Sequence, residues 1–261
     1  MIFLKEVEIV RIDLTKRESR HIKDCVAQEK PLNLFINRSF YATIFCSPSN
    51  LEELAVGHLA SEGIVKSIID IEEIEAKDDV CLVRLVSSVD AEKKLRFSRH
   101  FGRVILSACG MQGPYKPSRR LTKIKSTLKI QARMILDCVN KLNSASVFRK
   151  TGGVHAAAIF RDDGTTVAFA EDVGRHNAVD KAIGMAIMNK ADLGKCFLAS
   201  TGRLTGDTVM KSATVGLPIV ASIAAAIDSG IIIAKKANVT LAGFVRGNRM
   251  NVYSCPERIL S

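Results

Sequence analysis

The sequence predicts a mixed α/β protein with a smaller N-terminal α+β domain, residues 1–115, and a larger C-terminal α/β domain, residues 116–261. Strand and helix patterns are irregular early in the chain but alternate regularly after residue 151, which is typical of a layered α/β domain. Two Gly and one Pro interrupt regular structure within residues 107–114. With 261 residues, 47% of them hydrophobic, the chain has material for one large or two small cores.

Short strands and one helix account for the N-terminal region. Residues 49–52 have the Ser-Asn-Leu-Glu pattern of a capping box, so we expect a helix to begin there and to end at Gly63. Asp78-Asp79 lies between two apolar runs and predicts a hairpin turn. The predicted strands are residues 32–37, 41–46, 71–76, 80–86 and 104–106.

A long basic helix is expected to follow Ser118. Apolar residues recur at helical spacing from Leu121 to Leu142, and basic residues occupy the positions between them. The apolar stripe consists of Leu121, Ile124, Leu128, Ile135, Val139 and Leu142.

Strands and helices then alternate to the end of the chain. Asp162-Asp163-Gly164 separates two apolar runs and predicts a hairpin turn. The predicted strands are residues 155–160, 167–170, 196–200, 218–221, 240–245 and 250–254. The predicted helices are residues 177–189, 208–215 and 229–237.

The positive charge is concentrated in one part of the chain. The net charge is +11, but residues 93–150 hold 15 basic residues and one acidic residue. Residues 1–92, by contrast, hold 11 basic and 17 acidic residues. A segment with so many basic and so few acidic residues indicates a polyanionic partner. The common alternative interpretation is a basic surface that is simply exposed to solvent.

Seven cysteines without a C-x-x-C pair argue against a disulfide scaffold and a paired zinc site. The first residues are too charged for a signal peptide, and no apolar run approaches the length of a membrane span. We therefore expect a cytoplasmic protein.

Cys109 lies in a Gly-flanked loop inside the basic block, where nearby cations favour a reactive thiolate. The other six cysteines are expected to be structural.

Three further segments are rich in polar residues or glycine. Residues 171–177 read EDVGRHN, in which Asn177 suits a helix cap and His176 suits acid–base work or an anion contact. Residues 200–203 read STGR before a helix. Small residues at this position let backbone amides bind a phosphate, but the pattern most often marks an ordinary turn. Arg246 and Arg249 flank Gly247 at a strand end and suit phosphate or diphosphate.

These segments resemble the formate dehydrogenase accessory sulfurtransferases, the FdhD family. The most specific block is EDVGRHNAVDK at residues 171–181. Other matching blocks, in family order, are LEELAVG at 51–57, TGGVHAA at 151–157, GR at 202–203, GLP at 216–218, LAGF at 241–244 and NVY at 251–253. The resemblance spans residues 32–254, nearly the whole chain.

The resemblance implies a cytidine-deaminase-like three-layer α/β/α domain, a homodimer and a sulfurtransferase function. Such proteins accept sulfur from a cysteine desulfurase as a persulfide on a loop cysteine. They transfer it to the molybdenum (or tungsten) bis-guanine-dinucleotide cofactor before that cofactor enters formate dehydrogenase, and guanine nucleotides such as GDP are partial mimics of this substrate. By resemblance the catalytic residue is Cys109. The implied cofactor-binding residues are Phe244, Val245, Arg246, Gly247, Asn248, Arg249, Gly174, Arg175, His176 and Asn177.

One departure concerns the family's loop motif C-G-x-C-G, which reads CGMQG at residues 109–113. Gln112 replaces the second cysteine, so the sulfur-carrying role transfers to Cys109 alone. Residues 224–227 also lack the family's usual Ser/Thr-containing turn.

Three alternative functions compete with this interpretation. A zinc deaminase needs an H-x-E motif and a P-C-x-x-C motif, but Ala157 occupies the Glu position and no C-x-x-C exists, so we expect no zinc. A basic nucleic-acid-binding module would use the block at 93–150, which holds only four aromatic residues for base stacking. A degenerate deaminase-fold protein that binds a nucleotide without catalysis is the third alternative. We expect neither a nucleic-acid nor a membrane partner.

Overall fold

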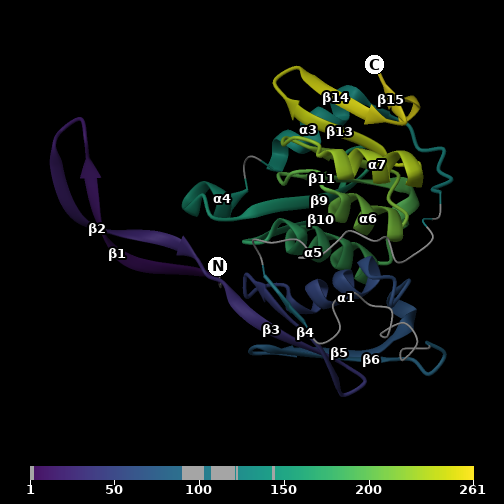
Figure 1. The fold of residues 1–261 in the computed structure, drawn as a ribbon, viewed down its shortest axis with the longest axis horizontal. Coiled ribbons are helices and arrows are strands. Elements are labelled where there is room, and N and C mark those ends of the chain that lie inside the picture. The colour runs from purple at the N-terminus through teal and green to yellow at the C-terminus, as the bar shows by residue number, and fades with distance from the viewer. Residues whose placement is uncertain (1–2, 90–102, 107–120, 122, 143–144) are drawn as a thin grey trace.

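The structure is a computed structural model that describes residues 3–89, 103–106, 121, 123–142 and 145–261 (Figure 1). Cys109 and the predicted domain boundary between residues 115 and 116 lie outside the described residues, so both stay predictions. None of the described helices is long and apolar enough to cross a membrane.

A five-stranded sheet in the order β5-β6-β3-β4-β7 forms the N-terminal part of the body. All five strands predicted there are present, and Asp78-Asp79 forms the turn between β5 and β6. The strands are β3 (Lys30–Ile36), β4 (Ser39–Cys46), β5 (Ile71–Lys77), β6 (Val80–Leu85) and β7 (Arg103–Ile105).

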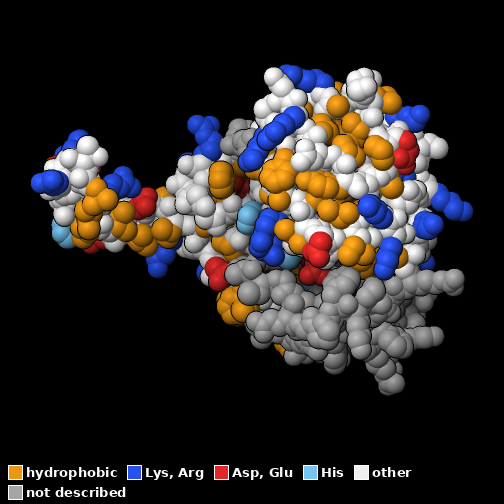
Figure 2. Space-filling model, turned by 45° about the horizontal axis from the view of Figure 1, so that its top comes forward, with side chains coloured by type: hydrophobic (Ala, Val, Ile, Leu, Met, Phe, Trp, Pro, Cys, Tyr) orange, Lys and Arg blue, Asp and Glu red, His pale blue; other side chains and the backbone are white. Residues whose placement is uncertain are grey.

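An antiparallel hairpin that the sequence patterns did not predict precedes this sheet. Its strands β1 (Leu4–Asp13) and β2 (Glu18–Ala27) form an arm that projects from the body (Figure 1). Phe3 anchors the base of the arm in a small apolar cluster with Val147 and Val154. Hydrophobic side chains follow the arm on the molecular surface (Figure 2).

The C-terminal region contains a six-stranded sheet in the order β10-β9-β11-β12-β13-β14. Every strand predicted in this region is present, and the predicted turn at residues 162–164 joins β9 to β10. The strands are β9 (His155–Arg161), β10 (Thr166–Asp172), β11 (Cys196–Ser200), β12 (Ile219–Ser222), β13 (Thr240–Arg246) and β14 (Arg249–Ser254).

Helices cover both faces of the six-stranded sheet. In β11, Leu198 faces one apolar core and Phe197 faces the other, because alternate side chains of a strand point to opposite faces. The first core is covered by α5 (Arg175–Met188), α6 (Gly206–Thr214) and α7 (Asp228–Ala237), and the second by α3 (Ala132–Leu142). The result is a three-layer α/β/α arrangement (Figure 1).

Helix α1 (Leu51–Ser61) connects the two sheets, since it packs on α5 and also contacts β5 and β6. The two helices approach closely at Gly57 and Gly184. A Cβ atom on Gly57 would overlap the carbonyl oxygen of Asp180, and one on Gly184 would overlap that of Glu53. The small elements are α4 (Ser146–Thr151), the paired strands β8 (Ile130–Gln131) and β15 (Ile259–Leu260), and single 3-10 turns at Ile68–Asp70, Leu193–Lys195 and Pro256–Arg258.

The prediction of one helix from Leu121 to Leu142 is wrong in its first half. Residues 123–129 are not helical, and α3 begins only at Ala132. The extended segment is held by tertiary contacts: the amide of Ile124 donates to Ala237 O at 2.9 Å, and Ser126 Oγ donates to Gly194 O at 3.0 Å. These contacts outweigh a weak local preference for helix.

The predicted capping box at residues 49–52 is also absent. Helix α1 begins after Asn50, which has a left-handed backbone (φ 52°) and makes no side-chain cap bond to the helix backbone. Its side-chain amide instead donates to Glu53 Oε1 at 3.2 Å. Asn tolerates a left-handed backbone better than most residues, which makes it suitable for this position.

Four strands of the six-stranded sheet run in the same direction. Because β10 and β11 both pair antiparallel with β9, they are parallel to each other, and β12 and β13 continue parallel to β11. Their carboxyl ends therefore lie along one edge of the sheet, here called the carboxyl edge.

Candidate functional site

The carboxyl edge carries four loops, at residues 173–174, 201–205, 223–227 and 247–248. In open α/β sheets, ligands bind outside the carboxyl ends of strands. Every sequence-predicted cofactor-binding residue lies on this edge, in two groups. The first is Gly174, Arg175, His176 and Asn177, and the second is Phe244, Val245, Arg246, Gly247, Asn248 and Arg249.

The two groups do not adjoin. They follow β10 and β13, which are four strand positions apart in the sheet. At a strand spacing of about 4.8 Å, their ends are about 19 Å apart. Only an extended ligand, such as a dinucleotide, reaches from one group to the other.

Asp172, at the end of β10, is a fully buried carboxylate paired with a fully buried Lys181, whose Nζ lies 2.6 Å from Oδ2. The backbone amides of Ser47 and Gly174 donate to the carboxylate at 3.0 and 2.7 Å. Burial raises the pKa of Asp172, and the Lys181 ammonium opposes that rise. Asp172 is therefore a structural anchor for the turn into α5.

Asn177 has a different role from the predicted helix cap. Helix α5 begins two residues earlier, with Gly174 as its N-cap residue. The buried Asn177 amide donates to Phe45 O at 2.8 Å and to Asp172 Oδ1 at 3.1 Å. It thereby ties the site edge to strand β4.

Asp180 is the centre of a second buried network. Lys211 Nζ donates to both carboxylate oxygens, at 2.9 and 2.7 Å, and Ser61 Oγ donates to Oδ1 at 2.8 Å. His58 Nδ1 lies 3.3 Å from Oδ2. Burial alone would raise the pKa of Asp180, but Lys211 and His58 outweigh it and hold the pKa at about 2. The network locks α1, α5 and α6 together beneath the carboxyl edge.

His176 faces helix α6, with Nε2 3.4 Å from Thr205 Oγ1. Burial and then the nearby Arg175 and Lys211 cations lower the pKa of His176 to about 4. The imidazole is therefore neutral near pH 7, so it serves as a neutral hydrogen-bonding group rather than as a cation.

The loop after β11 is held rigidly beside Arg175. Ser200 Oγ accepts from the Gly202 amide at 3.0 Å, and Ser222 Oγ donates to Gly202 O at 2.7 Å. A Cβ on Gly202 would lie 2.9 Å from Arg175 Cβ, so glycine lets the Arg175 stem lie against the loop. The sequence patterns had suggested a plain turn here.

His155 and Thr201 also lie on this edge, although sequence reasoning did not select them as site residues. His155 is the first residue of β9 and pairs with Asp172, and its Nδ1 lies 3.4 Å from Thr201 Oγ1. Burial and then the Arg175 and Arg203 cations lower the pKa of His155. Their position in the sequence could have identified them, since both residues lie next to predicted strand ends that meet at the carboxyl edge.

At the second group, the hairpin between β13 and β14 presents exposed basic side chains. Arg246 and Arg249 are directly opposite each other and exposed, on either side of Gly247 (φ +61°). The Arg246 guanidinium lies 5.2 Å from the centre of the Phe244 ring. Phe244 itself has φ 51°, a strained conformation of the kind that clusters at ligand sites. Val245 is fully buried in the core, so the structure does not leave it open to a ligand as predicted.

Five of the six described cysteines suit a structural role better than a reactive one. Burial raises the pKa of Cys46 and of Cys81 to about 12, and it also raises the pKa of Cys138, Cys196 and Cys255. Within the described ranges, no group of three His, Cys, Asp or Glu side chains could hold a metal ion.

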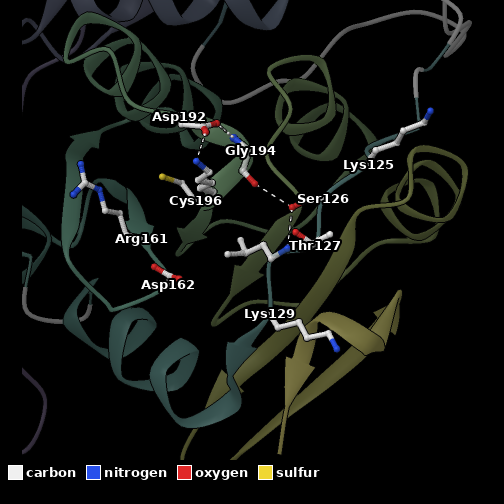
Figure 3. A pocket seen from close by; sticks show the side chains of 11 residues that line it. Lys125, Ser126, Thr127, Lys129, Arg161, Asp162, Asp192, Gly194 and Cys196 are labelled. Atoms are coloured by element: carbon white, nitrogen blue, oxygen red, sulfur yellow. Dashed lines mark hydrogen bonds and ion pairs between the residues drawn. The ribbon is translucent and has the colours of Figure 1, made fainter.

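A groove of about 860 Å³ lies at the opposite edge of the same sheet (Figure 3). Arg161 and Asp162 lie on one side of it, and Ser126 and Thr127 on the other (Figure 3). Cys196, at the amino end of β11, also lines it. It contains none of the predicted site residues, so we place the candidate site at the carboxyl edge instead.

The chain is similar over nearly its full length to several known proteins, whose names agree with one another. The chain is 39% identical to the sulfur carrier protein FdhD of Sulfolobus acidocaldarius, over 98% of both chains. It is 35% identical to the protein of that name from Methanothermobacter thermautotrophicus over the full length of both. A crystal structure of a proposed formate dehydrogenase accessory protein from Desulfotalea psychrophila matches with a TM-score of 0.78 and 25% identity, over 99% of this chain and 100% of that one. The FdhD/NarQ family profile matches residues 27–260, and the chain therefore belongs to the FdhD/NarQ family.

Proposed function

We propose that this protein is a sulfur carrier, a sulfurtransferase that serves formate dehydrogenase. It accepts sulfur from a cysteine desulfurase as a persulfide on Cys109 and transfers it to the molybdenum or tungsten bis-guanine-dinucleotide cofactor. The observation that carries this proposal is the near full-length similarity to relatives named sulfur carrier protein FdhD.

Cys109 is the best carrier because its sequence surroundings favour a thiolate. No acidic residue occurs between Lys93 and Leu136, and nearby cations lower the pKa of a thiol. Burial has the opposite effect on Cys46, Cys81, Cys138 and Cys196, so these thiols are poor nucleophiles.

The first transfer needs only a thiolate. The Cys109 thiolate attacks the outer sulfur of the desulfurase persulfide; the new S–S bond forms on Cys109 and the desulfurase cysteine leaves as a thiolate. No net oxidation occurs in this first transfer.

The second transfer delivers the sulfur to the metal as sulfide. It breaks the Cys109 S–S bond and requires two electrons. Because Gln112 replaces the second loop cysteine, the metal or an external thiol supplies these electrons.

The carboxyl edge supports the cofactor part of the proposal. Basic side chains lie at both of its ends, Arg175 after β10 and Arg246 and Arg249 after β13. A dinucleotide is long enough for this spacing and carries the matching negative charge. The order and directions of the six strands are consistent with a cytidine-deaminase-like domain, which we adopt as part of the proposal.

The proposal includes a homodimer and a cytoplasmic location. The arm offers a surface for protein contact, since Ile12 is 65% exposed and Leu14 is 86% exposed. A second copy of the chain is the occupant that we assign to it.

Complementation tests the proposal in cells. In a strain without its own sulfur carrier of this family, the wild-type chain should restore formate dehydrogenase activity and Cys109→Ser should not. Cys25→Ser, a matched change in the arm, should restore it. Full activity with Cys109→Ser would refute the sulfur-carrier proposal, and guanine-nucleotide binding without any restoration would favour a nucleotide-binding protein without sulfur chemistry.

A further inference from the structure

The groove at the opposite edge of the six-stranded sheet has no role in the proposed function, yet it is rich in positive charge. Four basic and two acidic side chains line it (Figure 3). The basic residues are Lys125, Lys129, Arg161 and Lys195, and the acidic residues are Asp162 and Asp192. Two of the lysines belong to the basic block at residues 93–150, for which the sequence indicates a polyanionic partner.

Three of the four basic side chains have no ion-pair partner in the part of the chain that the structure describes. Lys195 is paired with Asp192, whose Oδ2 lies 3.3 Å from the lysine Nζ. Lys125, Lys129 and Arg161 are exposed, and none of them forms an ion pair with a described carboxylate. Against these three cations the groove has one remaining carboxylate, so its surface is net positive.

One wall of the groove is the segment of residues 123–129, in which exposed and covered residues alternate. Lys125, Thr127 and Lys129 are exposed, whereas Ser126 and Leu128 between them are half-buried. This alternation is the pattern of a β-strand that has one open face. The open face therefore carries a lysine at each end and a small hydroxyl side chain between them.

The backbone of this segment is held from one side only. The Ile124 amide donates to Ala237 O at 2.9 Å, and the Asn238 side-chain amide donates to Ile124 O at 2.8 Å. No described residue, by contrast, bonds to the backbone amide or carbonyl of Lys125 or Thr127. An extended segment with free backbone groups of this kind is a template on which another strand can pair.

We propose that this groove is a docking site for an acidic, extended segment of a partner protein. The segment adds as a strand along residues 125–129, through the free backbone groups of Lys125 and Thr127. Its carboxylates lie beside Lys129, Arg161 and the first lysine, and acidic residues at every second position fit best, since alternate side chains of an extended chain share a face. The groove and the carboxyl edge are at opposite ends of the strands, so a docked partner leaves the cofactor site free.

The groove fits a peptide better than a nucleic acid. Its described lining contains no aromatic side chain on which a base could stack. Asp162 and Asp192 also line the groove, and they repel an unbroken row of phosphates. A peptide avoids this repulsion, because it can place neutral or basic residues beside the two carboxylates.

The test is a titration of the full-length protein with a labelled synthetic peptide in which Thr and Glu alternate, followed by fluorescence anisotropy. The peptide should bind at low salt and dissociate at high salt, because salt screens exposed charges. Replacement of every Glu by Gln should weaken binding more than roughly tenfold, since each exposed ion pair contributes up to about fivefold. A peptide of the same composition with its glutamates in one block should also bind more weakly.

N-methylation of the peptide tests the strand pairing without any change to the protein. An extended peptide directs its backbone amides alternately towards and away from the groove wall. Methylation of one alternate set of amides should therefore abolish binding, and methylation of the other set should preserve it. Equal effects of the two sets would overturn the inference.

Variants of the groove test its cations one at a time. Lys125→Gln, Lys129→Gln and Arg161→Gln should each weaken peptide binding about two- to fivefold. Lys77→Gln is the matched control, since it removes an exposed lysine from β5 in the other sheet and should have no effect. GDP should not displace the peptide, because the carboxyl edge is at the opposite end of the strands.

Equal losses in Lys77→Gln and the groove variants, or displacement of the peptide by GDP, would overturn the inference. Tighter binding of a single-stranded RNA of the same charge, lost in the same groove variants, would overturn it in favour of a nucleic-acid site. Sulfur loading of Cys109 is measured without peptide, so the proposed function would stand after any of these results.

Discussion

Lys181 Nζ lies 2.6 Å from Asp172 Oδ2, and neither side chain has any exposed surface. The lysine also donates to Ser47 O at 2.9 Å, so the pair joins the loop after β4 to the turn that begins α5. Both residues belong to the block at 171–181 that carried the family resemblance. In this block the side chains of Asp172, Asp180 and Lys181 are buried beneath the carboxyl edge, where they hold α5 against the neighbouring elements.

Asp172→Asn should destabilise the fold by about 3–5 kcal/mol, because it leaves the Lys181 ammonium buried without its counter-charge. Urea unfolding measures the loss. Asp137→Asn is the matched control, since it breaks an exposed pair with Arg133 (3.1 Å) and should cost less than about 1 kcal/mol. Equal losses in the two variants would contradict a buried ionic anchor.

Acidification should destabilise the protein through His176. Its pKa is about 4 in the folded state against an ordinary value of 6.5, so between these values the unfolded chain binds a proton that the folded chain does not. Stability is therefore full above pH 6.5 and decreases as the pH falls towards 4, by about 2 kcal/mol at pH 5. Urea unfolding at pH 7.5 and pH 5 should show a smaller difference for His176→Gln. An unchanged difference would rule out His176 as a cause.

Iodoacetamide should modify Cys109 ahead of the buried cysteines at pH 7.5. A thiol with a pKa of about 12, as for Cys46 and Cys81, holds roughly a thousandfold less thiolate than an ordinary thiol. Peptide mass spectrometry of the native protein follows the order of labelling, and unfolded protein should react at all seven cysteines. Labelling of Cys46 or Cys81 as fast as Cys109 would show that their burial does not protect them.

Arg246→Ala should weaken GDP binding about tenfold, because the variant removes an exposed guanidinium from the hairpin at the carboxyl edge. Titration calorimetry measures the change. Arg161→Ala is the control for non-specific charge, since Arg161 lies at the opposite edge of the sheet. If both variants weakened binding equally, the hairpin would not be a specific contact.

Much of the fold could be predicted from local sequence patterns. The turn at residues 162–164 and all six strands of the larger sheet follow from apolar runs between turn residues. The arm escaped prediction because charged residues such as Glu6, Glu8 and Arg11 interrupt its strands, and no core imposes a regular apolar pattern on them. The helix from Leu121 failed because contacts to Ala237 and Gly194, distant in sequence, decide the conformation.

For the candidate site, sequence reasoning found the segments but not the roles of their residues. Arg175 and Arg246 were selected, and both lie on the carboxyl edge. The helix-cap role expected for Asn177 was wrong because Gly174 begins the helix, which leaves Asn177 free to bind Phe45 O. His155 was missed because only the pairing of β9 with β10 and β11 brings it beside Arg175 and Arg203.

Sulfur loading of Cys109 is the most direct test of the carrier function. The purified protein is incubated with a cysteine desulfurase and L-cysteine, and its intact mass is measured before and after reduction. We predict a gain of one sulfur atom that a thiol reductant removes, present in Cys25→Ser and absent in Cys109→Ala. A reducible sulfur that still appears in Cys109→Ala would contradict the account.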